Sequence, residues 1–211
     1  MTIRAQIVDA MRALGARGLN AGTSGNVSVR TADGLLVTPS AVPPEALTAD
    51  SIVALDAQGR VLSGGVPTSE WRIHRDVYDA FPSAGAIVHT HSPYATALAA
   101  LREDLPAFHY QVAKAGGHVI RCSTFAMFGT QELSSAVIEA LGDRTACLMA
   151  NHGMLAYGAT LDGAVALATE VEVLCRQYLI ARSAGAPVIL TSEQMDDALD
   201  RFSRYGQPEG G

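Results

Sequence analysis

Two histidines separated by one residue close an apolar run in the first half of the chain. Residues 86–91 are typical of a buried strand, with His89 and His91 at its end. On a strand, residues i and i+2 point to the same face, so these two imidazoles project together and could bind one cation. Taken alone, the pair is more often an ordinary strand end with one histidine facing solvent.

Two further stretches strengthen the metal interpretation. A second apolar run, residues 145–150, ends in Asn151-His152-Gly153, where the glycine allows a sharp turn. Glu70 lies in the first turn of a predicted helix. Three imidazoles and one carboxylate form a ligand set suited to Zn²⁺, and a carboxylate that can leave the metal provides the open position of a catalytic site.

Small polar residues gather in three loops that could bind an anion. These loops are Thr23 to Asn26, Thr38 to Ala41, and Thr68-Ser69. Small side chains let backbone N–H groups approach a phosphate, and hydroxyls add donors. Each loop alone is more often ordinary turn chemistry. The last is the most informative, because its hydroxyls precede Glu70 directly, which would set a phosphate beside the metal.

Composition limits the classes of partner. The chain has 211 residues, 48% of them hydrophobic, which suits one compact domain spanning 1–211. The net charge is −6 and the sequence has no basic stripe, so we expect no nucleic-acid partner. We expect no membrane partner either, since no apolar run is long enough to cross a bilayer. The start of the chain lacks signal-peptide character, and Cys122, Cys147 and Cys175 lie in apolar contexts, which predicts reduced thiols in a cytoplasmic protein.

The elements that would position these residues follow from periodicity. We predict helices over 3–16, from Thr68 or Ser69 through Phe81, and over 94–101, 130–142, 161–184 and 192–204. We predict hairpins around Ala32-Asp33-Gly34 and around 57–59, and strands over 86–91, near 119–122, and over 146–150 and 154–157. This order predicts an α/β fold, a three-layer α/β/α arrangement with a central mixed, largely antiparallel sheet.

Four motifs together resemble a known family. They are Gly22-Thr23-Ser24-Gly25-Asn26-Val27-Ser28-Val29-Arg30, Pro67-Thr68-Ser69-Glu70-Trp71, His89-Thr90-His91 and Asn151-His152-Gly153. In order and spacing they are similar to the class II aldolase/adducin family, above all to its L-fuculose-1-phosphate aldolases, over nearly the whole chain.

The resemblance implies a homotetramer with one Zn²⁺ per subunit and active sites at subunit interfaces. The implied zinc ligands are Glu70, His89, His91 and His152, and the implied phosphate ligands are Thr23, Asn26, Ser40, Ala41, Thr68 and Ser69. Glu70 and Tyr110 would be catalytic, with Tyr110 reaching a neighbouring subunit's site. Phe128 and Tyr205 would shape the aldehyde side.

The sequence departs from the family pattern at several positions. Ser40-Ala41 replaces a Thr-Gly pair, so a backbone that needs a positive φ would be strained at Ala41. Thr68 replaces a serine and keeps the hydroxyl. Ser92-Pro93-Tyr94 differs from the fuculose-type enzymes just beyond the histidines, which leaves the sugar open more than the chemistry.

The implied reaction is reversible cleavage of a ketose 1-phosphate to dihydroxyacetone phosphate and a small aldehyde such as lactaldehyde. The alternatives are a 5-deoxyribulose or methylthioribulose 1-phosphate aldolase, or a pentulose-phosphate epimerase, a dehydratase or a sugar-acid phosphate decarboxylase on the same metal site. An alternative of another class is a non-enzymatic adducin-like scaffold module.

Among other residues, we expect His74 to be a hydrogen-bonded core residue, His109 to support Tyr110, His118 to be a loop residue and Lys114 to lie at the surface or an interface.

Overall fold

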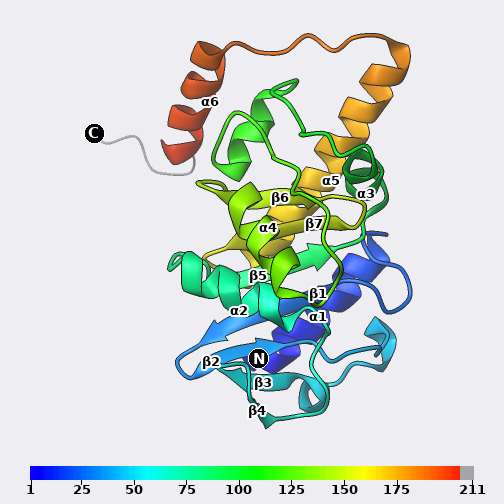
Figure 1. The fold of residues 1–211 in the computed structure, drawn as a ribbon, viewed down its shortest axis with the longest axis vertical. Helices are drawn as coiled ribbons and strands as arrows, with labels where there is room; N and C mark the ends of the chain where they lie inside the picture. The colour runs from blue at the N-terminus through cyan, green and yellow to red at the C-terminus, as the bar shows by residue number, and fades with distance from the viewer. Residues whose placement is uncertain (205–211) are drawn as a thin grey trace.

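The computed structural model describes residues 1–204, and its centre is one seven-stranded sheet (Figure 1). The spatial order of the strands is β4-β3-β2-β1-β5-β7-β6, and every ladder between them is antiparallel. The strands are β1 (Asn26–Thr31), β2 (Gly34–Val37), β3 (Val53–Asp56), β4 (Val61–Ser63), β5 (Ala86–Thr90), β6 (Ala146–Met149) and β7 (Gly153–Gly158). The predicted layered α/β fold with a largely antiparallel sheet is confirmed. Its only parallel pairing among the described residues is a single bridge between Cys122 and Leu148.

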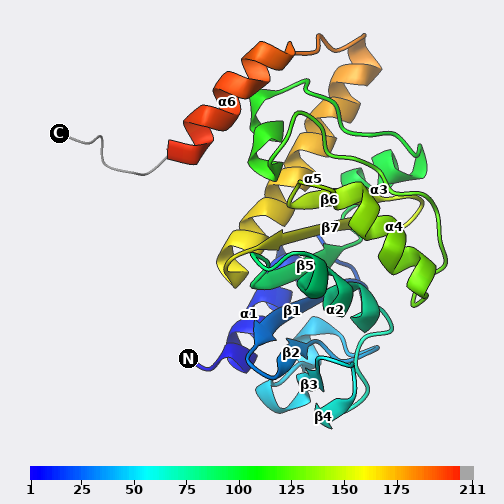
Figure 2. The ribbon, with the colours of Figure 1, turned by 60° about the vertical axis from the view of Figure 1, so that its left-hand side comes forward.

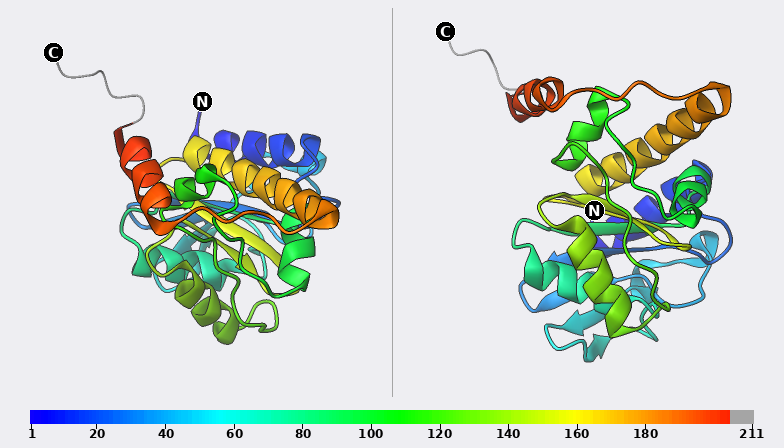
Figure 3. Two further views of the ribbon diagram at one scale, coloured as in Figure 1. Left: turned by 90° about the horizontal axis from the view of Figure 1, so that it is seen from above. Right: turned by 45° about the horizontal axis from the view of Figure 1, so that its top comes forward.

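Helices cover both faces of the sheet. The helices are α1 (Ile3–Ala16), α2 (Trp71–Ala80), α3 (Pro93–Ala100), α4 (Gln131–Leu141), α5 (Leu161–Ala184) and α6 (Ser192–Arg204), with 3₁₀ helices η1 (Pro44–Ala46), η2 (Ala49–Ser51) and η3 (Tyr110–Ala115). Seen from above, α1 and α5 lie on one side of the sheet and α2 and α4 on the other (Figure 3). Helix α6 packs on η3 at the end of the molecule away from β4 (Figure 2).

Each face of the sheet has its own apolar core because buried side chains alternate along the strands. Val88 points toward the α1, α3 and α5 side, and Ile87 points toward the α2 and α4 side. Strand β5 is buried along its whole length, since β1 and β7 flank it and helices cover it on both sides. A strand in that position holds its terminal side chains rigidly. No helix of the described chain is long and apolar enough to cross a membrane.

Local signals explain several helix boundaries. The side chains of Thr2, Thr130 and Thr160 accept hydrogen bonds from backbone N–H groups in the first turns of α1, α4 and α5. Pro93 opens α3, and the Glu172 carboxylate accepts from the N–H groups of the next two residues at 3.0 and 2.8 Å.

Two predictions of local structure were wrong. The strand predicted near 119–122 is reduced to isolated bridges, Leu105 to Ile120 and Cys122 to Leu148, because the segment pairs with the edge strand β6 at one residue only. Helix α2 begins at Trp71 with Glu70 in the capping position, and no side chain caps it. The hydroxyl of Thr68 and the carboxylate of Glu70, which could cap a helix, point into the site instead.

Candidate active site

The end of one strand, one turn and one helix start bring the predicted metal ligands together. His89 lies on β5 and His91 just after it, His152 lies in the turn between β6 and β7, and Glu70 precedes α2. Their ligand atoms all lie within 4.8 Å of one another. A Cβ added to Gly153 would lie 2.3 Å from the carbonyl oxygen of Thr90, so only glycine lets the β6–β7 turn approach the end of β5 this closely.

The ring planes in this cluster face a common centre. Each pair of the three imidazoles is nearly perpendicular, with ring centroids 4.8 to 4.9 Å apart. The Nε2 atoms of His89 and His152 lie 3.1 Å from the two Glu70 oxygens, and the Nε2 atoms of His89 and His91 lie 3.0 Å apart. Glu70 and His89 are buried, at 6% and 1% exposure.

Contacts behind the cluster determine which atoms face its centre. The Nδ1 of His89 lies 2.9 Å from the carbonyl oxygen of Met154 and must donate to it, so Nε2 is the nitrogen left to face the centre of the cluster. The Asn20 amide oxygen accepts from the backbone N–H of His91 at 3.2 Å. Asn20 also lies against Gly25, where any Cβ would meet its side chain, and it therefore connects the histidine strand to the Thr23–Asn26 loop.

The cluster strongly favours an ionised Glu70. Burial alone would raise the pKa of its carboxyl group, but the His89 and His152 imidazoles outweigh burial and hold that pKa far below its usual range. Burial, reinforced by His89 and His152, lowers the pKa of His91 to about 4. At neutral pH the centre therefore presents an anionic carboxylate and at least one imidazole with a free lone pair.

These residues fit a divalent cation. Glu70 Oε1 is buried and makes no hydrogen bond among the described residues; His152 Nε2 is 3.1 Å away but out of line. Two Nε2 atoms 3.0 Å apart can share at most one proton between them. A cation at the centre would satisfy the carboxylate oxygen and all the imidazole lone pairs at once. Nitrogen and carboxylate donors in this number suit Zn²⁺.

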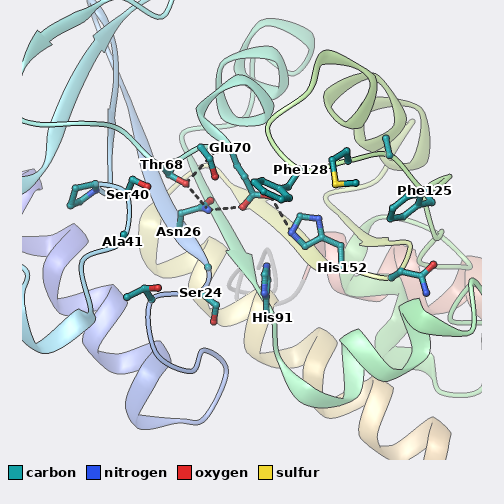
Figure 4. Close-up of a pocket in the computed structure, with 17 residues that line it drawn as sticks. Ser24, Asn26, Ser40, Ala41, Thr68, Glu70, His91, Phe125, Phe128 and His152 are labelled. Carbon is teal, nitrogen blue, oxygen red and sulfur yellow. Dashed lines mark hydrogen bonds and ion pairs between the residues drawn. The ribbon is translucent and has the colours of Figure 1, made fainter.

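A cavity of about 440 Å³ opens beside the cluster and joins the three loops that were predicted to bind an anion. It is lined by every residue predicted to bind phosphate: Thr23, Asn26, Ser40, Ala41, Thr68 and Ser69. Figure 4 shows Ser40 and Ala41 on one side of Asn26 and Glu70. The Asn26 amide donates to Glu70 Oε2 at 2.9 Å and to Thr68 Oγ1 at 3.1 Å, which connects the loops to the metal ligands.

The strain predicted at Ala41 is present. Its φ is +58°, in the left-handed region that favours glycine. This conformation turns the 38–41 loop toward the cavity, and the bridge between Pro39 and Pro67 holds that loop against the segment before α2.

The opposite side of the cavity is apolar. Phe125, Ala126, Met127 and Phe128 line it from the loop before α4, with three of them half or more exposed. In Figure 4, Phe125 lies beyond His152 from the Ser40 loop. Phe128 was predicted here. The contribution of its neighbours and of Asn151 was missed, although a run of apolar residues in an otherwise polar loop can indicate such a surface. Ser24 also lines the cavity, within the predicted Thr23–Asn26 loop.

Tyr110 does not line this cavity within its own chain. It lies on η3, 53% exposed, between the rings of His109 and Phe202. His109 stacks on it and its Nδ1 accepts from the Gln111 backbone N–H. Lys114, as expected, is near the surface and pairs with Glu170 at 3.0 Å. Tyr205 lies outside the described residues.

The remaining histidines follow their predictions. His74 is fully buried and hydrogen-bonded to Asn26 and Ser28. His118 lies in a loop and pairs with Asp196 of α6 at 2.7 Å. The three cysteines are free.

Comparison with known proteins agrees with this geometry. Residues 5–179 match the model of the class II aldolase and adducin N-terminal domain. A 5-methylthioribulose-1-phosphate/5-deoxyribulose-1-phosphate aldolase of Rhodospirillum rubrum is 46% identical over 98% of this chain and 93% of its own. The L-fuculose phosphate aldolase of Escherichia coli K12 is 44% identical over 95% and 94%. A solved L-fuculose 1-phosphate aldolase superposes with a TM-score of 0.93 at 36% identity, over 95% of this chain and 96% of its own. The chain belongs to the class II aldolase and adducin family.

Proposed function

We propose that this protein is a zinc-dependent aldolase that reversibly cleaves a ketose 1-phosphate to dihydroxyacetone phosphate and a small aldehyde. One observation carries the proposal: a single cavity joins a three-histidine, one-carboxylate cluster to small-residue loops on one side and an apolar wall on the other. A ligand with a phosphate at one end, two chelating oxygens in the middle and a short apolar tail matches the order in which these surfaces line the cavity.

Each group has a role in this scheme. Glu70, His89, His91 and His152 would hold the zinc ion, which when bound acts as a Lewis acid toward the substrate oxygens. Glu70 moves the proton at the carbon beside the carbonyl, since it is the buried carboxylate of the cluster. Tyr110 of a neighbouring subunit handles the proton on the aldehyde oxygen.

Phosphate recognition relies on neutral groups. Thr23, Asn26, Ser40, Ala41, Thr68 and Ser69 would provide hydroxyl, amide and backbone donors. Neither lysine nor arginine is among the residues that line the cavity, so the α2 N-terminus and the nearby metal would balance the phosphate charge.

Two aldehydes compete as products. L-Fuculose 1-phosphate would give lactaldehyde, with Phe128 and Tyr205 shaping the aldehyde side. The apolar run of Phe125, Ala126 and Met127 favours a second candidate, a 5-deoxyribulose or methylthioribulose 1-phosphate with a less polar tail. The relatives whose names mention these substrates support both.

The test is a panel of ketose 1-phosphates incubated with the zinc-loaded protein, with aldehyde products identified by mass spectrometry. We expect dihydroxyacetone phosphate from at least one member and none after chelation. Epimerised, dehydrated or decarboxylated products without aldehyde would replace the aldolase proposal with one of those reactions. A complete lack of turnover, with no zinc bound, would favour the scaffold alternative, against which the complete ligand cluster argues.

The proposal extends to assembly and location. A homotetramer with active sites at subunit interfaces would supply Tyr110 to each site, and one zinc ion per chain is expected. The cytoplasmic location predicted from the thiols belongs to the same proposal.

A further inference from the structure

A buried row of polar side chains lies between β1 and α2 and ends on the candidate catalytic carboxylate. Asn26 and Ser28 lie on one face of β1, two residues apart. Glu70, His74 and Tyr78 follow one another at four-residue intervals along one side of α2 and the residue before it. The strand set and the helix set alternate in space, and Figure 4 shows the end where Asn26 meets Glu70.

The contacts along this row are continuous. The Tyr78 hydroxyl lies 2.7 Å from Ser28 Oγ, which lies 2.6 Å from His74 Nδ1. His74 Nε2 lies 2.5 Å from Asn26 Oδ1, and Asn26 Nδ2 lies 2.9 Å from Glu70 Oε2. Ser28 and His74 are completely buried. Water therefore cannot replace a missing partner at the middle of the row.

The proton positions follow from the end of the row. An ionised Glu70 only accepts hydrogen bonds, so the Asn26 amide must turn its NH₂ toward it and its carbonyl oxygen toward His74. His74 must then carry its proton on Nε2, and its bare Nδ1 accepts from the Ser28 hydroxyl. The single Ser28 proton is used in that bond, so Tyr78 donates to Ser28. Every donor in the row points toward Glu70.

His74 is suited to orienting its neighbour and unsuited to exchanging protons at neutral pH. Burial, together with the nearby His89 imidazole, lowers the pKa of His74 to about 3. The ring therefore stays neutral and keeps one N–H, on the side that Asn26 requires.

We infer that His74 is a positioning residue of this site: through Asn26 it holds the Glu70 carboxylate in place for both metal binding and proton transfer. The inference rests on the proposed function only for the second of these tasks. Without the His74 N–H, the row holds no donor for the Asn26 carbonyl oxygen and the amide is oriented by Glu70 alone, while a reversed amide would set an oxygen against the carboxylate.

Two substitutions of similar polarity separate positioning from simple packing. In His74→Gln the side-chain amide can reach the place of Nε2 and donate to Asn26. In His74→Asn the amide reaches only the place of Nδ1, so the contact with Ser28 survives and the contact with Asn26 is lost. Tyr78→Phe removes the far end of the row. Its matched control is Tyr157→Phe, because Tyr157 is buried in the same core and its hydroxyl contacts Ser83 outside the row.

The experiment uses zinc-loaded full-length protein and three readouts. The tautomer of His74 is read by ¹⁵N NMR, zinc affinity by competition with a chelator, and proton exchange on dihydroxyacetone phosphate by ¹H NMR in deuterated water. We expect an Nε2–H tautomer. We also expect about a 10- to 100-fold loss in zinc affinity and exchange rate for His74→Asn. His74→Gln should stay close to wild type, Tyr78→Phe should fall between, and Tyr157→Phe should match wild type.

The outcomes distinguish the inference from the proposed function. An Nδ1–H tautomer, or equal zinc affinity in His74→Gln and His74→Asn, would overturn the positioning role. If wild type shows neither exchange nor cleavage, the aldolase proposal fails, whereas the tautomer and the zinc affinities still decide the role of His74. If His74→Asn does not fold, the comparison of Tyr78→Phe with Tyr157→Phe decides it: equal zinc affinities would overturn the inference.

Discussion

The orientation and charge of single residues in this site are determined by the groups that contact them from outside the cavity. His89 presents Nε2 because its Nδ1 donates to the Met154 carbonyl, and His91 is held through the Asn20 amide oxygen. Glu70 is ionised because imidazoles surround it. The contact that makes a residue functional is therefore often on the side away from the ligand.

We expect His91→Ala to lose most of the bound metal. The three remaining ligands cannot close the coordination shell, and the substitution also opens the centre to water. Metal analysis of purified protein should show about one Zn²⁺ per wild-type chain and far less in the variant. The control is His118→Ala, which removes a histidine paired with Asp196 outside the cluster. Equal zinc in His91→Ala and wild type would remove His91 from the ligand set.

Thr68→Ala should raise the KM for the sugar phosphate by roughly 10-fold or more, because a hydrogen bond to a charged group contributes about 1.5–3 kcal/mol. Thr68→Ser keeps the hydroxyl and is the matched control. Steady-state kinetics on a phosphorylated sugar and on its dephosphorylated form check the assignment. Equal turnover of both forms by wild type would show that the phosphate subsite has been misassigned.

The helices and strands that carry the site residues determine which parts of the site could be predicted from the sequence. His89, His91 and His152 could be predicted because each ends an apolar run, and a strand end has a fixed direction. The row from Tyr78 to Glu70 could not be predicted as a unit. Its polar residues are spaced two apart on the strand and four apart along the helix, and this spacing has meaning only once β1 and α2 are known to pack together. The strand near 119–122 failed for a related reason: apolar residues predict burial but not a pairing partner.

At the loop before η1, replacing Ala41 with glycine should stabilise the fold. A left-handed φ costs an L-residue about 1–2 kcal/mol, whereas glycine adds about 0.5–1 kcal/mol of backbone entropy loss. We therefore expect the free energy of unfolding to rise, by up to about 1.5 kcal/mol. The exposed Ala57, which lacks a positive φ, should lose stability as Ala57→Gly. Chemical denaturation measures both, and a loss at position 41 as large as that at position 57 would contradict the strain argument.

The packing of α2 on β1 predicts a pH dependence of stability. The pKa of His74 falls from 6.5 to about 3 on folding, so the unfolded chain binds more protons between these values. Stability from this residue is then complete above pH 6.5 and is lost as pH falls toward 3, at about 1.4 kcal/mol per pH unit.

Metal-free His74→Gln should show a correspondingly smaller loss of unfolding free energy between pH 6.5 and about pH 5 than metal-free wild type. Chemical denaturation at several pH values measures it. Glu70, His89 and His91 titrate in both proteins and cancel in the comparison. Parallel curves for the two proteins would mean that His74 is not buried in its neutral form.

At the scale of the whole molecule, one chain does not assemble every group in the proposed reaction. The cavity holds Glu70 and the histidines, whereas Tyr110 lies on η3 beside α6 and does not line it. Its ring is half-exposed and stacked at a defined angle by His109 and Phe202, which suits a side chain presented to another subunit.

Glu70→Gln and Tyr110→Phe should therefore fail in different steps. Glu70→Gln should abolish proton exchange on dihydroxyacetone phosphate, a step that needs no aldehyde, while retaining some metal. Tyr110→Phe should keep exchange and lose most cleavage activity, because its work is on the aldehyde oxygen. Exchange followed by NMR and cleavage followed by aldehyde release make the comparison. If both variants lose exchange equally, Tyr110 acts at an earlier step.

Mixing these two inactive variants then tests the assembly. In a hybrid oligomer, a Tyr110→Phe subunit keeps its own Glu70 and can receive an intact Tyr110 from a Glu70→Gln neighbour. In a ring with random one-to-one mixing, both conditions hold at about a quarter of the sites, so roughly that share of wild-type activity should return. Glu70→Gln mixed with the double variant is the control and should stay inactive, because none of its subunits has an intact Glu70. Hybrids verified by native mass spectrometry that recover no activity would mean that each chain builds its site alone, and Tyr110 would then have to reach its own cavity from η3 by moving.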